Sequence, residues 1–192
     1  MNVQDALNYI NTELERNGVI DRELDENRVL YITRHTQLNP RHMFFIMRGL
    51  LTAPKSSTFE ECIQSCTYLV TREVFGAYRH IYPDAQTISE QFINGNSVIF
   101  TGSELEKRYN WFAKRHLEDK YMLYRMFLDM GIMGKITGHG EQYVEASFQY
   151  NSFNPISASS KDELCIHPAF SLCFQALVPQ EHAPILPRGT IL

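Results

Sequence analysis

Hydrophobic positions in the N-terminal third of the chain recur at the spacing of an α-helix. One such stripe is formed by Val3, Leu7, Ile10 and Leu14, and it predicts a helix over residues 2–17. Val29 and Ile32 indicate a second helix over residues 25–35. A third is predicted over residues 39–51, because Asn39 suits an N-cap and Pro40 suits the first helical position. Apolar residues cover most sides of this third helix, which predicts a central place in its subdomain.

A new set of helical patterns begins after residues 52–57, a short stretch typical of a boundary. Thr58 and Glu61 form a capping box before a long helix over residues 59–80. Another helix is predicted to end before Gly95, followed by a short extended segment at residues 98–100. Ser103 and Glu106 form a second capping-box pattern, which opens a helix to about residue 116 with Tyr109, Trp111 and Phe112 as packing groups.

The pattern changes from helical to alternating between residues 121 and 150. A helix over residues 121–130 ends at Gly131, where positive φ is tolerated. Residues 133–137, a turn at 138–140 and a strand at 143–150 follow, and the strand alternates apolar and polar side chains as a half-buried strand does. Residues 164–166 indicate a third strand, and His167-Pro168 begins a helix to about residue 177.

A helix that leads directly into a β-hairpin is the pattern of a winged helix. The sequence therefore predicts a mainly α protein with an N-terminal helical subdomain at residues 1–52. A winged-helix domain with a small antiparallel hairpin or three-stranded sheet is predicted at residues 58–178. Residues 179–192 hold three prolines and are expected to form an extended C-terminal tail.

Composition narrows the class of protein. A hydrophobic content of 44% with 21% charged residues is typical of a folded chain. The net charge of −4 counts against a dedicated nucleic-acid binder. Four cysteines without a disulfide pattern indicate a reducing compartment. With neither a membrane-spanning run nor a signal peptide in the sequence, we expect a soluble cytoplasmic protein without a membrane partner.

Motifs for catalysis, nucleotides or metals are not recognisable. The stretch from Gly131 to Thr137 has P-loop residue types, but the spacing is wrong and a helix precedes it. Cys62, Cys66, Cys165 and Cys173 lack zinc-site spacing and are interpreted as core residues. The imidazole of His167 is interpreted as a helix cap or a satisfied core group, since no nucleophile–base pair is readable nearby. We therefore predict no catalytic residue, no metal and no cofactor.

Basic residues are concentrated between residues 103 and 135. Seven Lys/Arg against five Asp/Glu leave this segment at +2 and the rest of the chain at −6. The candidate nucleic-acid contacts are Lys107, Arg108, Lys114, Arg115, Lys120, Arg125 and Lys135. A solvated helical face accounts for the same residues without a ligand, and we favour it.

Residues 39–51, beginning Asn39-Pro40-Arg41, resemble the lid helix of P-loop ATPases of the AAA+ and STAND type. The downstream segments at residues 123–136, 143–150 and 164–170 are similar to the winged-helix segment that follows the lid in some bacterial STAND-like ATPases. The resemblance implies a lid-like subdomain at residues 1–52 and makes Arg41 a sensor-2-like residue that reaches nucleotide phosphates. Neither a Walker A nor a Walker B motif is present, so ATP would be bound only if the chain were joined to a nucleotide-binding core.

Three functions fit these patterns. The leading hypothesis is a noncatalytic regulatory and partner-binding module, whose partner is another protein or the missing ATPase core. The second is a winged-helix protein that binds duplex DNA, and salt-dependent binding would distinguish it from the first. An enzyme of an unrecognised class is the third, and it would require a pocket with perturbed pKa values.

Overall fold

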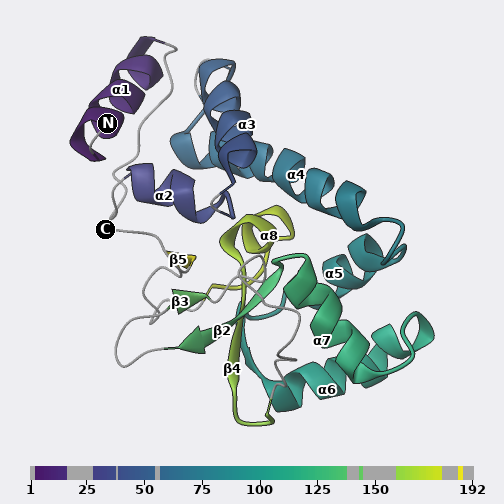
Figure 1. The fold of residues 1–192 in the computed structure, drawn as a ribbon. Coiled ribbons are helices and arrows are strands. Elements are labelled where there is room, and N and C mark those ends of the chain that lie inside the picture. Colours follow the sequence, from purple (N-terminus) through teal and green to yellow (C-terminus); the bar gives the residue numbers. More distant parts are fainter. Residues whose placement is uncertain are drawn as a thin grey trace.

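A computed structural model of the chain describes residues 3–16, 28–37, 39–54, 57–137, 143–144, 159–178 and 186–187. The protein is mainly helical with a small sheet against one side of the helices (Figure 1). The helices are α1 (Val3–Arg16), α2 (Arg28–Arg34), α3 (Pro40–Leu51), α4 (Phe59–Tyr78), α5 (Ala85–Ile93), α6 (Gly102–Trp111), the 3-10 turn η1 (Ala113–Arg115), α7 (Lys120–Asp129) and α8 (Pro168–Cys173). Within these described ranges, none of the helices combines the length and the apolar character needed to cross a membrane.

The sheet contains β1 (Ile99–Thr101), β2 (Met133–Thr137), β3 (Tyr143–Val144), β4 (Glu163–Ile166) and β5 (Leu186–Pro187) in the order β1-β4-β2-β3-β5. β1, β4, β2 and β3 pair antiparallel, whereas β5 runs parallel to β3. Ile136 pairs with Val144 and Met133 with Ile166, which confirms the predicted hairpin and third strand where they are described. The predicted turn at 138–140 and the strand beyond residue 144 lie outside the described residues, as does most of the predicted tail.

Two of the predicted helix starts are confirmed by their caps. The Asn39 side chain accepts a hydrogen bond from the Arg41 N–H at 2.9 Å. Thr58 and Glu61 form the reciprocal capping box, with Thr58 Oγ1 accepting from Glu61 N at 3.2 Å. Gly131 adopts φ +64° directly after α7, as a helix C-terminus with a left-handed residue requires.

Other boundaries were predicted wrongly. The capping box of α6 is formed by Thr101 and Glu104 instead of Ser103 and Glu106, because Thr101 is the last residue of β1 and the helix follows without a linker. α6 ends at Trp111 and α8 at Cys173, each several residues earlier than expected. α3 is not enclosed on most sides, since the Phe44 side chain is 59% exposed.

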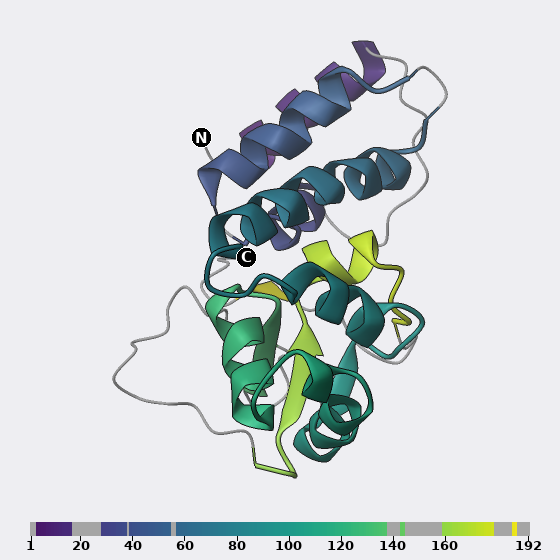
Figure 2. The same cartoon turned by 90° about the vertical axis from the view of Figure 1, so that its right-hand side faces the viewer.

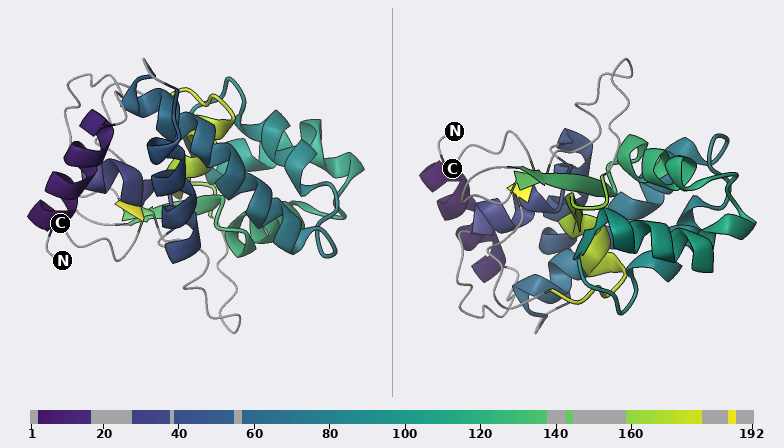
Figure 3. Two further views of the ribbon diagram at one scale, coloured as in Figure 1. Left: turned by 90° about the horizontal axis from the view of Figure 1, so that it is seen from above. Right: turned by 90° about the horizontal axis from the view of Figure 1, so that it is seen from below.

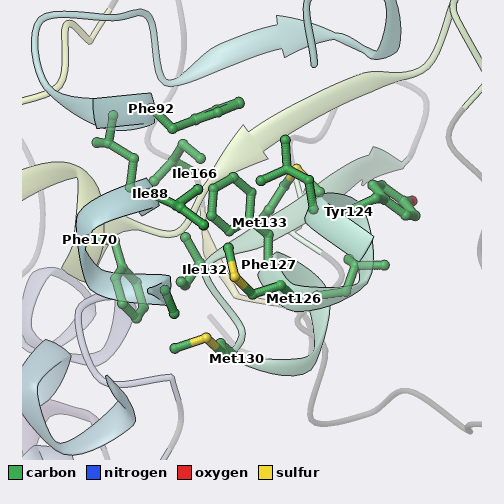
Figure 4. Packing of buried hydrophobic residues seen from close by; sticks show 14 of the residues in the cluster. Ile88, Phe92, Tyr124, Met126, Phe127, Met130, Ile132, Met133, Ile166 and Phe170 are labelled. Atoms are coloured by element: carbon green, nitrogen blue, oxygen red, sulfur yellow. The ribbon is translucent and has the colours of Figure 1, made fainter. Parts of the chain in front are cut away.

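The larger hydrophobic core lies between the sheet and the helices α5, α6 and α7 (Figure 4). Phe92 of α5 is its centre, with ring centroids 4.9 Å from Phe127 and 5.0 Å from Phe100, both edge-to-face. Ile132 and Met133 enter this core directly from the α7–β2 turn. Burial of Ile132 and Met133 therefore stabilises this turn, in addition to the left-handed conformation of Gly131.

A smaller core joins α2, α3 and the first half of α4. Gly49 of α3 allows close approach, since a Cβ there would lie 1.9 Å from Cys66 Sγ on α4. The second half of α4 contributes Val70, Val74 and Phe75 to the larger core. Figure 2 shows α3 and α4 side by side above the body that contains the sheet, and Figure 3 shows the same arrangement from above and from below. α4 is therefore common to both cores, and the predicted division near residues 52–58 stays a prediction.

Candidate functional site

Arg41 occupies the first turn of α3, as the cap at Asn39 dictates. Its side chain is 69% exposed, and its guanidinium lies 2.9 Å from Glu73 Oε1 of α4. The guanidinium carbon also lies 5.7 Å from the centre of the Phe45 ring. Exposed ion pairs are weak, so this contact positions Arg41 without fixing it. An anion that approached Arg41 would compete with Glu73.

A cavity of about 180 Å³ lies beside this ion pair, between the α2–α3 turn, α4 and the end of α7. Its polar lining residues include the carboxylates Glu73 and Asp129 and the imidazole of His42. Val74, Ala77, Tyr78 and Met130 supply most of the apolar wall. Among the residues that the structure describes, neither Arg41 nor any other Lys or Arg lines it, so the formal charge of these lining residues is −2 with His42 neutral.

Gln37 closes one end of this cavity and joins the two halves of the protein. Its Nε2 donates to the carbonyl oxygens of Met130 at 3.0 Å and Gly131 at 2.9 Å. Carbonyls at a helix C-terminus otherwise lack a partner, so a side chain from the α2–α3 turn completes α7. Gln37 adopts φ +49°, an uncommon value for a residue other than glycine, and its side chain is buried. The sequence contained no signal for this contact, which spans more than ninety residues.

Three buried histidines interact electrostatically near this site, and one of them, His42, lines the cavity; the other two are His35 and His167. Nδ1 of His35 donates to Tyr31 O at 2.6 Å, and Nδ1 of His42 donates to Thr36 O at 2.7 Å, because a carbonyl can only accept. In the neutral rings the Nε2 atoms of these two histidines are consequently acceptors. His167 has the opposite tautomer, because its Nδ1 accepts from Ala169 N–H at 3.1 Å and its Nε2 must carry the proton.

Burial keeps these imidazoles neutral. It lowers the pKa of His35 to about 3, with the neighbouring charge of Arg34 acting in the same direction. The pKa of His167 is lowered to about 3 by burial and by its proximity to His35 and His42. Burial also lowers the pKa of His42, although the Thr36 carbonyl and Glu73 oppose the shift. The prediction that His167 caps a helix is confirmed, but His167 Nε2 has no hydrogen-bond partner among the described residues, so it is not fully satisfied.

The basic residues proposed as nucleic-acid contacts fall into two groups. Four of them are engaged within the fold. Lys120 pairs with Glu106 at 2.9 Å, Lys135 with Asp162 at 2.9 Å, and Arg125 approaches Asp129 at 3.5 Å. The Arg108 guanidinium is half-buried over the Phe92 ring at 4.7 Å and donates to the Phe92 carbonyl at 3.2 Å. The charges of α7 and of β2 are thus largely neutralised by neighbouring carboxylates or by the fold.

The second group flanks an exposed tryptophan in the sequence. Lys107, Lys114 and Arg115 are exposed, and no ion pair joins them to another described residue. Trp111 lies between them in the chain, one helical turn after Lys107, and its side chain is 86% exposed. The prediction that Trp111 is a packing group was therefore wrong. We refer to Lys107, Trp111, Lys114 and Arg115 as the Trp111 surface.

The sequence contained the signal for this exposure. Leu105, Tyr109 and Phe112 are spaced as one face of a helix, and Leu105 and Tyr109 are buried while Phe112 is partly buried. Trp111 follows Tyr109 by two positions, which on a helix of 3.6 residues per turn places it about 200° away. Its position relative to the inward face therefore predicted exposure, although its residue type favoured burial.

The cysteines are core residues, as predicted, with Cys62, Cys66 and Cys165 buried and Cys173 partly buried. Burial raises the pKa of the Cys66 thiol to about 11 and of the Cys165 thiol to about 12, which opposes thiolate formation. In the part of the chain that the structure describes, no three His, Cys, Asp or Glu side chains are arranged to hold a metal ion.

Comparison with protein-family models, with curated proteins and with solved structures finds no match to this chain. The site therefore has to be interpreted from its own geometry.

Proposed function

We propose that this chain is a noncatalytic partner-binding module built on a winged helix, and that the Trp111 surface contacts an acidic face of a partner protein. The element order α5-β1-α6-η1-α7-β2-β3-β4, with β4 between β1 and β2 in the sheet, supports the winged-helix assignment. In that arrangement α7 follows α6 as the second helix of a helix-turn-helix, and the hairpin that begins with β2 forms the wing.

The observation that carries the proposal is an exposed indole beside three unpaired cations. Tryptophan and arginine are enriched at the energetic centres of protein interfaces. An exposed tryptophan offers a large apolar surface that a partner can bury, and the cations select a negatively charged partner. Figure 1 shows α6 and α7 at the end of the molecule opposite to α1 and α2, where a partner could approach.

The chain supplies its own reporter, because Trp111 is the single tryptophan of the sequence. A labelled peptide rich in Glu and Leu is titrated against the full chain, with anisotropy and tryptophan emission as readouts. We expect binding with a blue shift of Trp111 emission, since the indole leaves water. In the anisotropy assay, Trp111→Ala and a charge reversal of Lys107, Lys114 and Arg115 each weaken binding at least tenfold, about 1.4 kcal/mol.

Arg72→Glu is the matched control, because Arg72 is exposed on α4 away from α6 and the substitution reverses the same charge. It should change binding less than twofold. If the peptide leaves the Trp111 emission unchanged, or if Arg72→Glu weakens binding as much as reversal at the Trp111 surface, the assignment of this surface is wrong.

Duplex DNA is the second candidate ligand, favoured by the same three unpaired cations on a winged-helix framework. Against it, both basic residues of α7 have carboxylate neighbours. Binding through Lys107, Lys114 and Arg115 would give a slope of about −3 for the logarithm of affinity against the logarithm of salt concentration. Tight binding to random duplex DNA with this slope, stronger than binding to the acidic peptide, would make DNA the ligand and reject the protein partner.

The resemblance to the lid and winged-helix region of bacterial P-loop ATPases suggests one specific partner, a separate nucleotide-binding core. In that role Arg41 would supply a permanent positive charge to nucleotide phosphates from the first turn of α3. Because the Arg41 guanidinium already contacts Glu73, nucleotide phosphates would compete with this carboxylate for it. Arg41→Ala should abolish any stimulation of a core ATPase by this chain, whereas Arg48→Ala, at an exposed position later on α3, should not.

A further inference from the structure

The cavity beside Glu73 combines a negative lining with an apolar wall, and this combination identifies a class of ligand. Its charged side chains are two carboxylates, and its wall includes Val74, Ala77, Tyr78 and Met130. A cavity of about 180 Å³ has room for roughly six water molecules, which is also enough for a short alkyl chain with a polar end.

Hydrogen-bond acceptors are present in excess. Glu73 Oε2 is buried and accepts no hydrogen bond among the described residues. His42 Nε2, in a side chain that is 3% exposed, lies 3.7 Å from Glu73 Oε2. Because His42 Nδ1 donates to Thr36 O, Nε2 of the neutral ring is also an acceptor. The two acceptors thus face each other, and the buried Glu73 Oε2 costs free energy until an N–H or O–H is supplied to it.

The second carboxylate is only partly satisfied. Asp129 Oδ2 accepts from the Tyr82 hydroxyl at 2.7 Å and lies 3.5 Å from Arg125 Nε. The Tyr78 ring, stacked against the Tyr82 ring with centroids 6.4 Å apart, lines the cavity beside Asp129. Aromatic faces attract cations, so Tyr78 adds to the effect of the carboxylates. Arg41 and Arg125 contact these carboxylates without lining the cavity.

We propose that this cavity binds a cation rich in N–H donors, an alkylammonium or alkylguanidinium group, with its charge between Glu73 and Asp129 and its carbon chain along Val74, Ala77 and Met130. The group could belong to a free amine or to a lysine or arginine side chain of a partner. The site is independent of the Trp111 surface, because the lining residues come from the α2–α3 turn, α4 and the end of α7.

The test uses n-butylammonium chloride as the ligand and NMR shifts of the Val74, Ala77 and Gly131 amides of the full chain as the readout. 1-Butanol and sodium chloride are the controls for chain length and ionic strength. We expect saturable shifts at these amides with n-butylammonium and none that saturate with either control. Equal responses to n-butylammonium and 1-butanol would overturn the proposal.

Two nearly isosteric variants test the carboxylates separately. Glu73→Gln supplies an amide donor to His42 Nε2, and Asp129→Asn keeps an acceptor for the Tyr82 hydroxyl, so both should fold. Each should weaken n-butylammonium binding at least tenfold, whereas Glu90→Gln, at an exposed position on α5, should not. Wild-type affinity in both cavity variants would overturn the proposal.

The source of the cation is distinguished by a third ligand, the blocked tripeptide acetyl-Gly-Lys-Gly-amide. Binding at least as tight as that of n-butylammonium identifies a lysine side chain of a partner as the natural occupant. Exclusion of the tripeptide, with n-butylammonium still bound, identifies a free amine.

Discussion

Mild acid should destabilise this protein, because three imidazoles are buried in the neutral form. The pKa of His35 and of His167 is lowered from 6.5 to about 3 in the folded state. A group with a depressed pKa contributes stability above its unfolded pKa and loses it as the pH falls toward its folded pKa. The window for this loss therefore opens near pH 6.5 and extends to about pH 3.

The size of this loss of stability follows from the pKa of each histidine in the unfolded and in the folded state. At about pH 5 an unfolded histidine is almost fully protonated and the buried one is not, which lowers the free energy of unfolding by about 2 kcal/mol per group relative to about pH 7. His35 and His167 together should remove about 4 kcal/mol. His42 acts in the same direction. This is a large share of the roughly 5–15 kcal/mol that stabilises a typical domain.

Urea denaturation at several pH values between about 7 and 5 measures this loss directly. The carboxylates with lowered pKa values, Glu104 and Asp162, have ordinary values of 4.5 and 3.8 and therefore act mostly below about pH 5, outside the range of this assay. His167→Asn removes one titrating group and keeps a side-chain acceptor for the Ala169 N–H. The variant should be less stable near neutrality, because ring packing is lost, but its stability should fall only about half as far with pH.

His80→Asn is the control, because His80 is exposed and the variant should keep the full loss of about 4 kcal/mol. The reasoning is refuted if the wild-type protein loses less than about 1 kcal/mol between these pH values. It is also refuted if His167→Asn and the wild-type protein show the same pH dependence.

Three further changes test individual contacts through urea denaturation at neutral pH. Gln37→Leu removes the donor to two carbonyls at the end of α7 and should cost about 1–3 kcal/mol, whereas Gln64→Leu at an exposed site of α4 should cost less than about 0.5 kcal/mol. Gly102→Ala would place a Cβ 2.1 Å from the Ser159 carbonyl oxygen and should cost about 1–3 kcal/mol. In the control Gly76→Ala the new Cβ meets nothing within 4 Å, so this variant should be neutral or stabilising. Equal losses of stability in the two variants would contradict the packing at Gly102. Thr58→Ala should cost about 1 kcal/mol through loss of the capping box, and a loss of the same size in Thr58→Ser would refute the role of its hydroxyl.

Local signals predicted the parts of the fold that depend on neighbouring residues. Asn39-Pro40, the Thr58–Glu61 box and Gly131 act within one turn of chain, so each could be identified without knowledge of the tertiary structure. The hairpin was identified because strand alternation is equally local. Tertiary contacts decided the start of α6. Both Thr101–Glu104 and Ser103–Glu106 fit the capping pattern, and pairing of Thr101 with Glu163 in the sheet favours the first.

The candidate site was less accessible to prediction. The cavity is assembled from residues near positions 37–42, 73–78 and 129–131, and no local pattern brings these segments together. The tautomers of the three histidines likewise depend on carbonyl and amide partners set by the tertiary fold. Trp111 could have been identified from the helical spacing of Leu105 and Tyr109, since periodicity is a stronger guide to burial than residue type within one helix.

The cavity lies between elements of the two cores, so a ligand bound in it would connect them. Glu73 lies in the second half of α4, the helix shared by both cores, whereas Asp129 and Gly131 belong to α7 and its turn. Gln37 already connects the α2–α3 turn to the end of α7 through two hydrogen bonds. A cation held between Glu73 and Asp129 would add a second connection that forms only when the ligand is present. It would bind the assembled arrangement in preference to the unfolded chain, so at a hundred times its Kd it should raise the free energy of unfolding by about 2.7 kcal/mol. The cavity is therefore placed to make α7 and the β2 strand that follows it respond to what occupies the cavity.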